Sequence, residues 1–148
     1  MKATSYIYSQ KRGKLQVTPR SLLVIDDNDN DNFIILVKLF LELDTDWKII
    51  TALDGKEGIA KARLEQPDLI LLDVAMPGLD GIAVYKMLKS ERATRSIPIV
   101  FLTAMIGMEK VVQSQVDTDV EVITKPMSII FLKDRITDLC DRYLPLRM

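Results

Sequence analysis

The chain has 148 residues, of which 48% are hydrophobic and 28% charged, a composition typical of one globular domain. No apolar run approaches the roughly 18 residues of a membrane-spanning helix, and no secretory signal is evident, so we expect a cytoplasmic protein without a membrane span. Histidine is absent, which excludes a histidine base and imidazole metal ligands. The single cysteine, Cys140, excludes an intrachain disulfide.

Charge is unevenly distributed along the chain. Residues 1–20 contain five basic residues and no acid, so the net charge of −1 leaves −6 on residues 21–148. Five charges spread over twenty residues are more typical of a solvated extension than of a surface that binds nucleic acid or lipid. We therefore expect residues 1–19 to form a flexible N-terminal extension, and we expect no direct DNA binding.

From Ser21 onward, short β-type runs alternate with helical periodicity, which is the pattern of successive βα units. Asp80 and Ser128 are the expected N-caps of two of the helices. The alternation predicts one α/β domain over residues 20–144, with no output domain after it. Its expected fold is a flavodoxin-like, doubly wound five-stranded parallel sheet with strand order 2-1-3-4-5 and helices on both faces. The expected strands are 22–25, 48–53, 69–73, 99–103 and 120–124, and the expected helices are 31–42, 55–65, 81–91, 109–115 and 128–143.

Acidic residues end two strands that are neighbours in this strand order. Asp26 and Asp27 follow the first strand, and Asp73 ends the third, so we expect the three carboxylates to meet at the carboxyl edge of the sheet. Clustered carboxylates repel one another unless a cation neutralises them. Oxygen donors without histidine or cysteine select Mg²⁺, Mn²⁺ or Ca²⁺, and Mg²⁺ also accompanies phosphoryl groups. Asp73 can then act as a nucleophile and form an acyl phosphate, with Thr103 and Lys125 binding the phosphoryl oxygens.

These residues resemble the receiver domain of two-component response regulators, of the single-domain type, over about residues 20–144. The resemblance implies that Asp73 accepts a phosphoryl group from a sensor histidine kinase or a histidine phosphotransfer protein. The matching motifs are Asp26-Asp27, the segment LLDVAMPGLDG at 71–81, Thr103-Ala104 and Lys125-Pro126.

The resemblance also implies the roles of the other site residues. The metal ligands would be Asp26, Asp27, Asp73 and the backbone carbonyl of Ala75, with Mg²⁺ as the cofactor. Lys125 would contact the phosphate, and Thr103 would reorient towards the phosphate. The Lys125–Pro126 peptide bond would be cis. The protein would be no enzyme beyond its own phosphorylation and dephosphorylation.

Two positions depart from the family pattern. Val122 stands three residues before Lys125, where the family commonly has a switching Tyr or Phe. Ala75, two residues after Asp73, offers no side chain to hold or shield a hydrolytic water. Output could therefore differ from the usual form, and the rate of dephosphorylation is open.

Several interpretations of the function compete. The leading one is a phosphorylation switch that acts on a downstream protein through the face formed by 109–115, 120–124 and 128–143, by homodimerisation, or as a phosphate sink. The alternative is a receiver-fold interaction module that works without phosphorylation. A phosphatase of the haloacid-dehalogenase type needs a second acid at the position of Ala75. An EF-hand loop that starts at Asp27 would need a glycine where Asn32 stands and a glutamate where Lys38 stands.

Overall fold

The computed structural model describes residues 20–27, 42, 47–76, 80–104, 107–116, 119–124 and 129–143. Within them the chain forms a five-stranded sheet and four helices of at least eight residues. The elements are β1 (Ser21–Ile25), β2 (Lys48–Ala52), α3 (Gly55–Glu65), β3 (Leu69–Asp73), α4 (Gly81–Ser90), β4 (Ile99–Thr103), α5 (Met108–Gln115), β5 (Glu121–Thr124) and α6 (Ile129–Tyr143).

All four strand pairs of the sheet are parallel, and the strand order is β2-β1-β3-β4-β5. This confirms the fold predicted from the sequence. The register brings Ile25 opposite Leu72, so the chain leaves β1 and β3 at the same level and at the same edge of the sheet. On the other side of β3, Asp73 is opposite Leu102.

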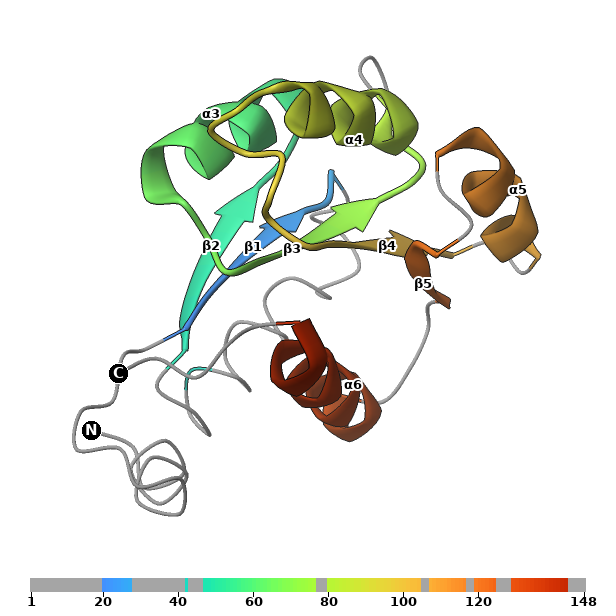
Figure 1. Cartoon of the computed structure of the whole chain (residues 1–148). Coiled ribbons are helices and arrows are strands. Elements are labelled where there is room, and N and C mark those ends of the chain that lie inside the picture. The colour runs from blue at the N-terminus through green and yellow to red at the C-terminus, as the bar shows by residue number, and fades with distance from the viewer. Residues whose placement is uncertain are drawn as a thin grey trace.

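The sheet separates two apolar layers (Figure 1). Helices α3 and α4 cover one face, where Ile59, Ala62 and Val84 pack with Phe101 of β4. Helix α6 covers the opposite face through Ile136 and Leu139. Strands β1, β3 and β4 contribute side chains to both layers, which explains why their sequences are almost continuously apolar.

The predicted element boundaries agree with the structure to within one residue wherever the structure describes them. Strand β2 ends at Ala52 rather than Leu53, because Leu53 is exposed and Asp54 already caps α3 by accepting a hydrogen bond from the Glu57 N–H. The predicted N-cap at Asp80 is confirmed, since its Oδ1 accepts from the Ala83 N–H at 2.9 Å.

Some predictions concern residues outside the described part of the chain. These are the extension 1–19, most of the helix at 31–42, of which Glu42 is described as helical, and the cap at Ser128. No helix in the described ranges has the length and apolar character that crossing a membrane requires.

The two edges of the sheet, β2 and β5, have different surroundings. On β2, the Lys61 side chain of α3 reaches over the strand and donates from Nζ to the Thr51 carbonyl at 2.5 Å. Lys61 is held in place by an ion pair with Glu57 at 2.9 Å, one helical turn earlier. On β5, Glu121 forms an ion pair with Arg135 of α6.

Candidate functional site

Three carboxylates converge at the carboxyl edge of the sheet. One oxygen each of Asp26, Asp27 and Asp73 lies within 4.8 Å of the other two. Asp26 is fully buried and Asp73 is 7% exposed, whereas Asp27 is partly buried. The parallel register of β1 and β3 produces this cluster, as predicted from the strand order.

The backbone fixes the position of each acid from its own strand. The Asp26 N–H donates to the Ala52 carbonyl at 3.0 Å, which extends the β1–β2 pairing by one residue. After Asp73, the Val74 N–H donates to the Leu102 carbonyl of β4 at 2.9 Å. The hydrogen bonds of the sheet therefore hold the backbone from which the Asp26 and Asp73 side chains extend.

The loop that follows β3 bends back onto Asp73. The Ala75 N–H donates to Asp73 Oδ1 at 3.2 Å, which orients one carboxylate oxygen. The loop returns to the strand where the Gly81 N–H donates to the Val74 carbonyl at 3.0 Å. Gly81 belongs to the motif at 71–81, but its sequence position did not predict this contact. A glycine directly after the helix cap Asp80 was the only available signal.

Thr103 ends β4 beside this cluster and is buried, with 1% of its surface exposed. Its register partner on β5 is Thr124, the residue before Lys125. Lys125 and Pro126, and with them the predicted cis bond, lie outside the described residues.

Val122 occupies the position at which receiver domains commonly have a Tyr or Phe. It is partly buried, packs against the apolar layer under α3 and α4, and is opposite Phe101 in the β4–β5 register. Phe101 in turn lies against Tyr85 of α4, with ring centroids 5.4 Å apart. The aromatic contacts of this region therefore involve β4 and α4.

The donor set fits a hard divalent cation. Three carboxylate oxygens within 4.8 Å create a concentrated negative charge, and two of the three acids are almost removed from water. Oxygen ligands of this kind suit Mg²⁺, which usually takes one or two carboxylates and keeps several waters. In the part of the chain that the structure describes, the acidic site thus offers ligands suited to Mg²⁺. The exposed Ala75 lies beside this site.

The parallel α/β fold is shared with known proteins. A family model described as "Response regulator receiver domain" matches residues 22–137. The response regulator PleD of Caulobacter vibrioides is 36% identical over 118 residues, which are 80% of this chain and 25% of PleD. The alkaline phosphatase synthesis transcriptional regulatory protein PhoP of Bacillus subtilis is 39% identical over 110 residues, 74% of this chain and 43% of PhoP.

Solved structures agree with the sequence comparison. The receiver domain of the Francisella response regulator 1452 superposes with a TM-score of 0.69 at 28% identity, covering 83% of this chain and 98% of that domain. The chain therefore belongs to the response regulator receiver domain family of two-component systems. It spans a quarter of the length of PleD and less than half of the length of PhoP.

Proposed function

We propose that this receiver domain is phosphorylated on Asp73 in a Mg²⁺-dependent reaction. The observation that carries the proposal is the convergence of Asp26, Asp27 and Asp73 within 4.8 Å at the carboxyl edge of the sheet. The phosphoryl donor is a phosphohistidine of a sensor histidine kinase or of a histidine phosphotransfer protein. Since this chain contains no histidine, it cannot supply that donor itself.

In the reaction, a carboxylate oxygen of Asp73 attacks the phosphorus of the phosphohistidine. The new P–O bond forms an acyl phosphate, and the P–N bond to the donor breaks, with its electron pair returning to the imidazole. The Ala75 N–H donates to Asp73 Oδ1 at 3.2 Å and so helps to orient the carboxylate for this attack. Later attack of water on the phosphorus releases inorganic phosphate and restores the carboxylate.

Other residues of the site have supporting roles in this proposal. Asp26, Asp27, Asp73 and the Ala75 carbonyl hold Mg²⁺, which neutralises charge on the phosphoryl oxygens when it is bound. Lys125 follows Thr124 in sequence and would pair with the phosphoryl group, and the Thr103 hydroxyl would donate to it. The chemistry is limited to this self-modification, without turnover of an external substrate.

The added charge at Asp73 is proposed to change the face formed by α5, β5 and α6, and so the binding of a downstream protein or of a second copy. Exposed apolar side chains are present on both helices of this face, with Val111 on α5 42% exposed and Phe131 on α6 54% exposed. A partner can bury such side chains.

Val122 supports a second candidate, in which the domain binds its partner without phosphorylation. Its contact with the apolar layer and with the Phe101 strand involves no aromatic ring on β5 that could change position with Thr103. The two candidates differ in one property, because only the first needs the Asp73 carboxylate for output.

The test is intact-mass spectrometry after incubation with Mg²⁺ and acetyl phosphate. We expect one phosphoryl adduct on the wild-type protein and none on Asp73→Asn or without Mg²⁺. The Asp134→Asn variant, which removes an exposed acid of α6, serves as the charge-matched control and should form the adduct. If the wild type forms no adduct and beryllofluoride does not bind, the phosphorylation proposal is wrong and the second candidate stands.

A further inference from the structure

Gly81, the first residue of α4, packs directly against the backbone of the strand that carries Asp73. A Cβ atom added to Gly81 would lie 2.1 Å from the Asp73 carbonyl oxygen and 2.9 Å from the Val74 Cα. Both atoms belong to the backbone, so rotating a side chain cannot relieve the overlap. Any other residue at this position must displace either the end of β3 or the beginning of α4.

Three hydrogen bonds fasten the helix at this point. The Gly81 N–H donates to the Val74 carbonyl, and the Asp80 carboxylate accepts from the Ala83 N–H. The Val84 N–H donates to the Asp80 carbonyl at 3.0 Å, which is the first bond of the helix. The beginning of α4 is thus fastened to the end of β3.

Ala75, which follows Val74 at the end of β3, carries two groups of the acidic site. The Ala75 N–H orients the Asp73 carboxylate. The Ala75 carbonyl is the fourth proposed ligand of the cation. Since Val74 lies between Asp73 and Ala75, a shift of the Val74 backbone changes the direction of both oxygen donors.

We propose that Gly81 is a positioning residue for the acidic site. Its missing side chain allows α4 to begin against β3, so that the Asp73 carboxylate and the Ala75 carbonyl meet Asp26 and Asp27 around one Mg²⁺. This inference rests on the proposed function. Gly81 itself touches neither the cation nor the phosphoryl group, and it acts through the backbone of Asp73 and Val74.

A second buried glycine provides a matched control. An added Cβ on Gly58 of α3 would meet Ile25 at 2.5 Å from Cδ1 and 2.8 Å from Cγ1. Those atoms belong to a side chain of the apolar layer, although Ile25 directly precedes Asp26. Gly58→Ala therefore overpacks the apolar layer beside β1, the strand that leads to Asp26. It leaves the backbone of the site in place. Alanine is the better helix former in both cases, so helix propensity does not explain a loss.

The experiment measures Mg²⁺ affinity by isothermal titration calorimetry for wild type, Gly81→Ala and Gly58→Ala, each shown to be folded by circular dichroism. We expect Gly81→Ala to weaken Mg²⁺ binding by about tenfold or more, the usual effect of losing support behind a metal ligand. Gly58→Ala should retain the wild-type affinity even where its melting temperature falls. At low Mg²⁺ the Gly81→Ala variant should also form less phosphoryl adduct from acetyl phosphate. Added Mg²⁺ should restore part of the lost adduct.

The outcomes separate this inference from the proposed function. A folded Gly81→Ala variant with wild-type Mg²⁺ affinity overturns the positioning role and leaves phosphorylation of Asp73 untouched. Equal losses in Gly81→Ala and Gly58→Ala also overturn it, because general overpacking would then explain both. A wild-type protein that binds no Mg²⁺ overturns the proposed function together with this inference.

If Gly81→Ala does not fold, variants of the adjacent cap test the same point. Asp80→Ala removes the bond to the Ala83 N–H, whereas Asp80→Asn retains a cap at the same net charge. We expect weaker Mg²⁺ binding for Ala than for Asn. Asp54→Ala, which removes the equivalent cap of α3, should leave the affinity unchanged. Equal affinities for the two Asp80 variants would contradict the inference.

Discussion

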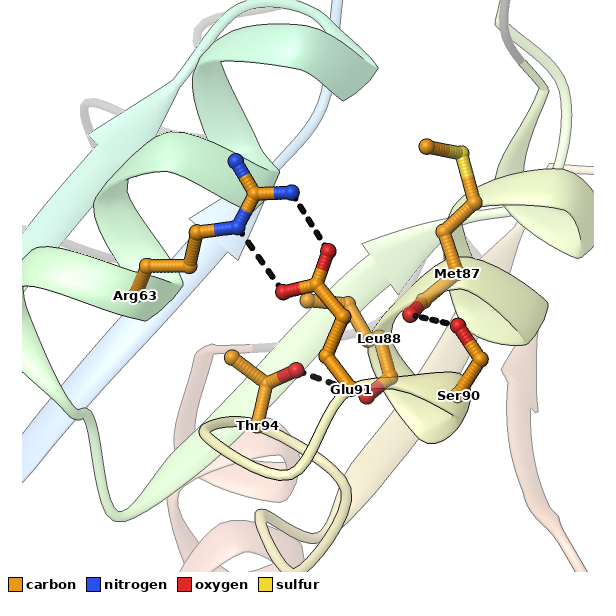
Figure 2. Close-up of polar contacts among 6 residues, drawn as sticks. All are labelled: Arg63, Met87, Leu88, Ser90, Glu91 and Thr94. Atoms are coloured by element: carbon orange, nitrogen blue, oxygen red, sulfur yellow. Dashed lines mark hydrogen bonds and ion pairs between the residues drawn. The ribbon is translucent and has the colours of Figure 1, made fainter.

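Thr94 shows how one polar group is satisfied inside the core. The residue is fully buried in the turn after α4, and its Oγ1 donates to the Leu88 carbonyl at 2.6 Å (Figure 2). Leu88 is near the end of α4, where carbonyls have no partner within the helix. The Thr94 hydroxyl therefore stabilises the end of the helix from within the protein.

We expect Thr94→Val to lower the free energy of unfolding by about 1–2 kcal/mol, because the Leu88 carbonyl loses its donor at a fully buried position. Urea unfolding monitored by circular dichroism measures this change. The control is Ser90→Ala, which removes an exposed hydroxyl that donates to the Met87 carbonyl at 2.7 Å in the same helix (Figure 2). Its effect should remain within about 0.5 kcal/mol; equal losses in the two variants would contradict a role for burial.

Prediction from sequence succeeded for the site residues that topology brings together. Asp26, Asp27 and Asp73 end apolar strands, and a parallel sheet places such ends at one edge, so their convergence followed from the strand order. The contact of Gly81 with the Asp73 backbone did not follow, since it depends on how closely α4 approaches β3. That distance is a property of packing and has no periodic pattern in the sequence.

Helices α3 and α4 are joined at one end by polar contacts. Arg63 faces Glu91 with two nitrogens (Figure 2): Nε donates to Oε2 at 2.8 Å, and Nη2 forms a short ion pair with Oε1. Nearby, Gln66 ends α3 in the left-handed conformation, with φ of 48°. Its Nε2 donates to the Ala93 carbonyl at 3.0 Å, which connects the end of α3 to the turn after α4.

The Arg63–Glu91 pair makes stability depend on pH in a defined direction. The side-chain hydrogen bond from Arg63 is the main cause that lowers the pKa of Glu91, and the same bond raises the pKa of Arg63. Because the pKa of Glu91 is lower in the folded protein, the pair stabilises the fold above the ordinary glutamate pKa of about 4.3. This contribution is lost as the pH falls through the lower pKa of the folded state.

We expect a coupling free energy between Arg63→Ala and Glu91→Gln at pH 7 and a smaller one at pH 3. A double-mutant cycle from urea unfolding measures it at both pH values. The coupling should be modest, because the Arg63 side chain is 51% exposed and water screens the charges. The control pair is Lys48–Glu65, a single 3.4 Å contact with a more exposed cation, for which we expect less coupling at pH 7.

Most element boundaries could be predicted because each has a local cause. Apolar runs that end in a polar residue define β3 and β4, and Asp80 marks the beginning of α4. The Arg63–Glu91 pair could not be predicted, because its residues are 28 positions apart and meet only through the packing of two helices. The end of α3 at Gln66 also has no glycine to indicate a left-handed residue.

At the scale of the whole molecule, the acidic site opposes the stability of the fold. Without a cation, carboxylates this close repel one another, and the fold must hold them together. The apolar layers on both faces of the sheet supply the stability that permits this. We expect binding of the proposed Mg²⁺ to remove this repulsion and so to raise the global stability.

We expect Asp27→Asn to stabilise the protein in EDTA and to reduce the further stabilisation that Mg²⁺ provides. In EDTA the free energy of unfolding of the variant should exceed that of wild type by about 1–3 kcal/mol, which is the Coulomb energy of charges at this separation. Urea unfolding measures this difference. With Mg²⁺ at ten times its Kd, wild type should gain about 1.4 kcal/mol, and the variant should gain less. Lower stability of Asp27→Asn in EDTA would contradict a repulsive cluster. Asp134→Asn, at an exposed position of α6, is the control with little change expected in either buffer.

The Lys61 side chain over Thr51 also has a consequence for assembly into larger particles. An exposed edge strand offers unpaired backbone groups to which a strand of another molecule can add, and this is a common route to aggregation. On β2 the ammonium group already occupies the Thr51 carbonyl and places a charge beside that edge. Strand addition on β2 would have to displace this ammonium group, so we expect the contact to disfavour uncontrolled polymerisation through β2.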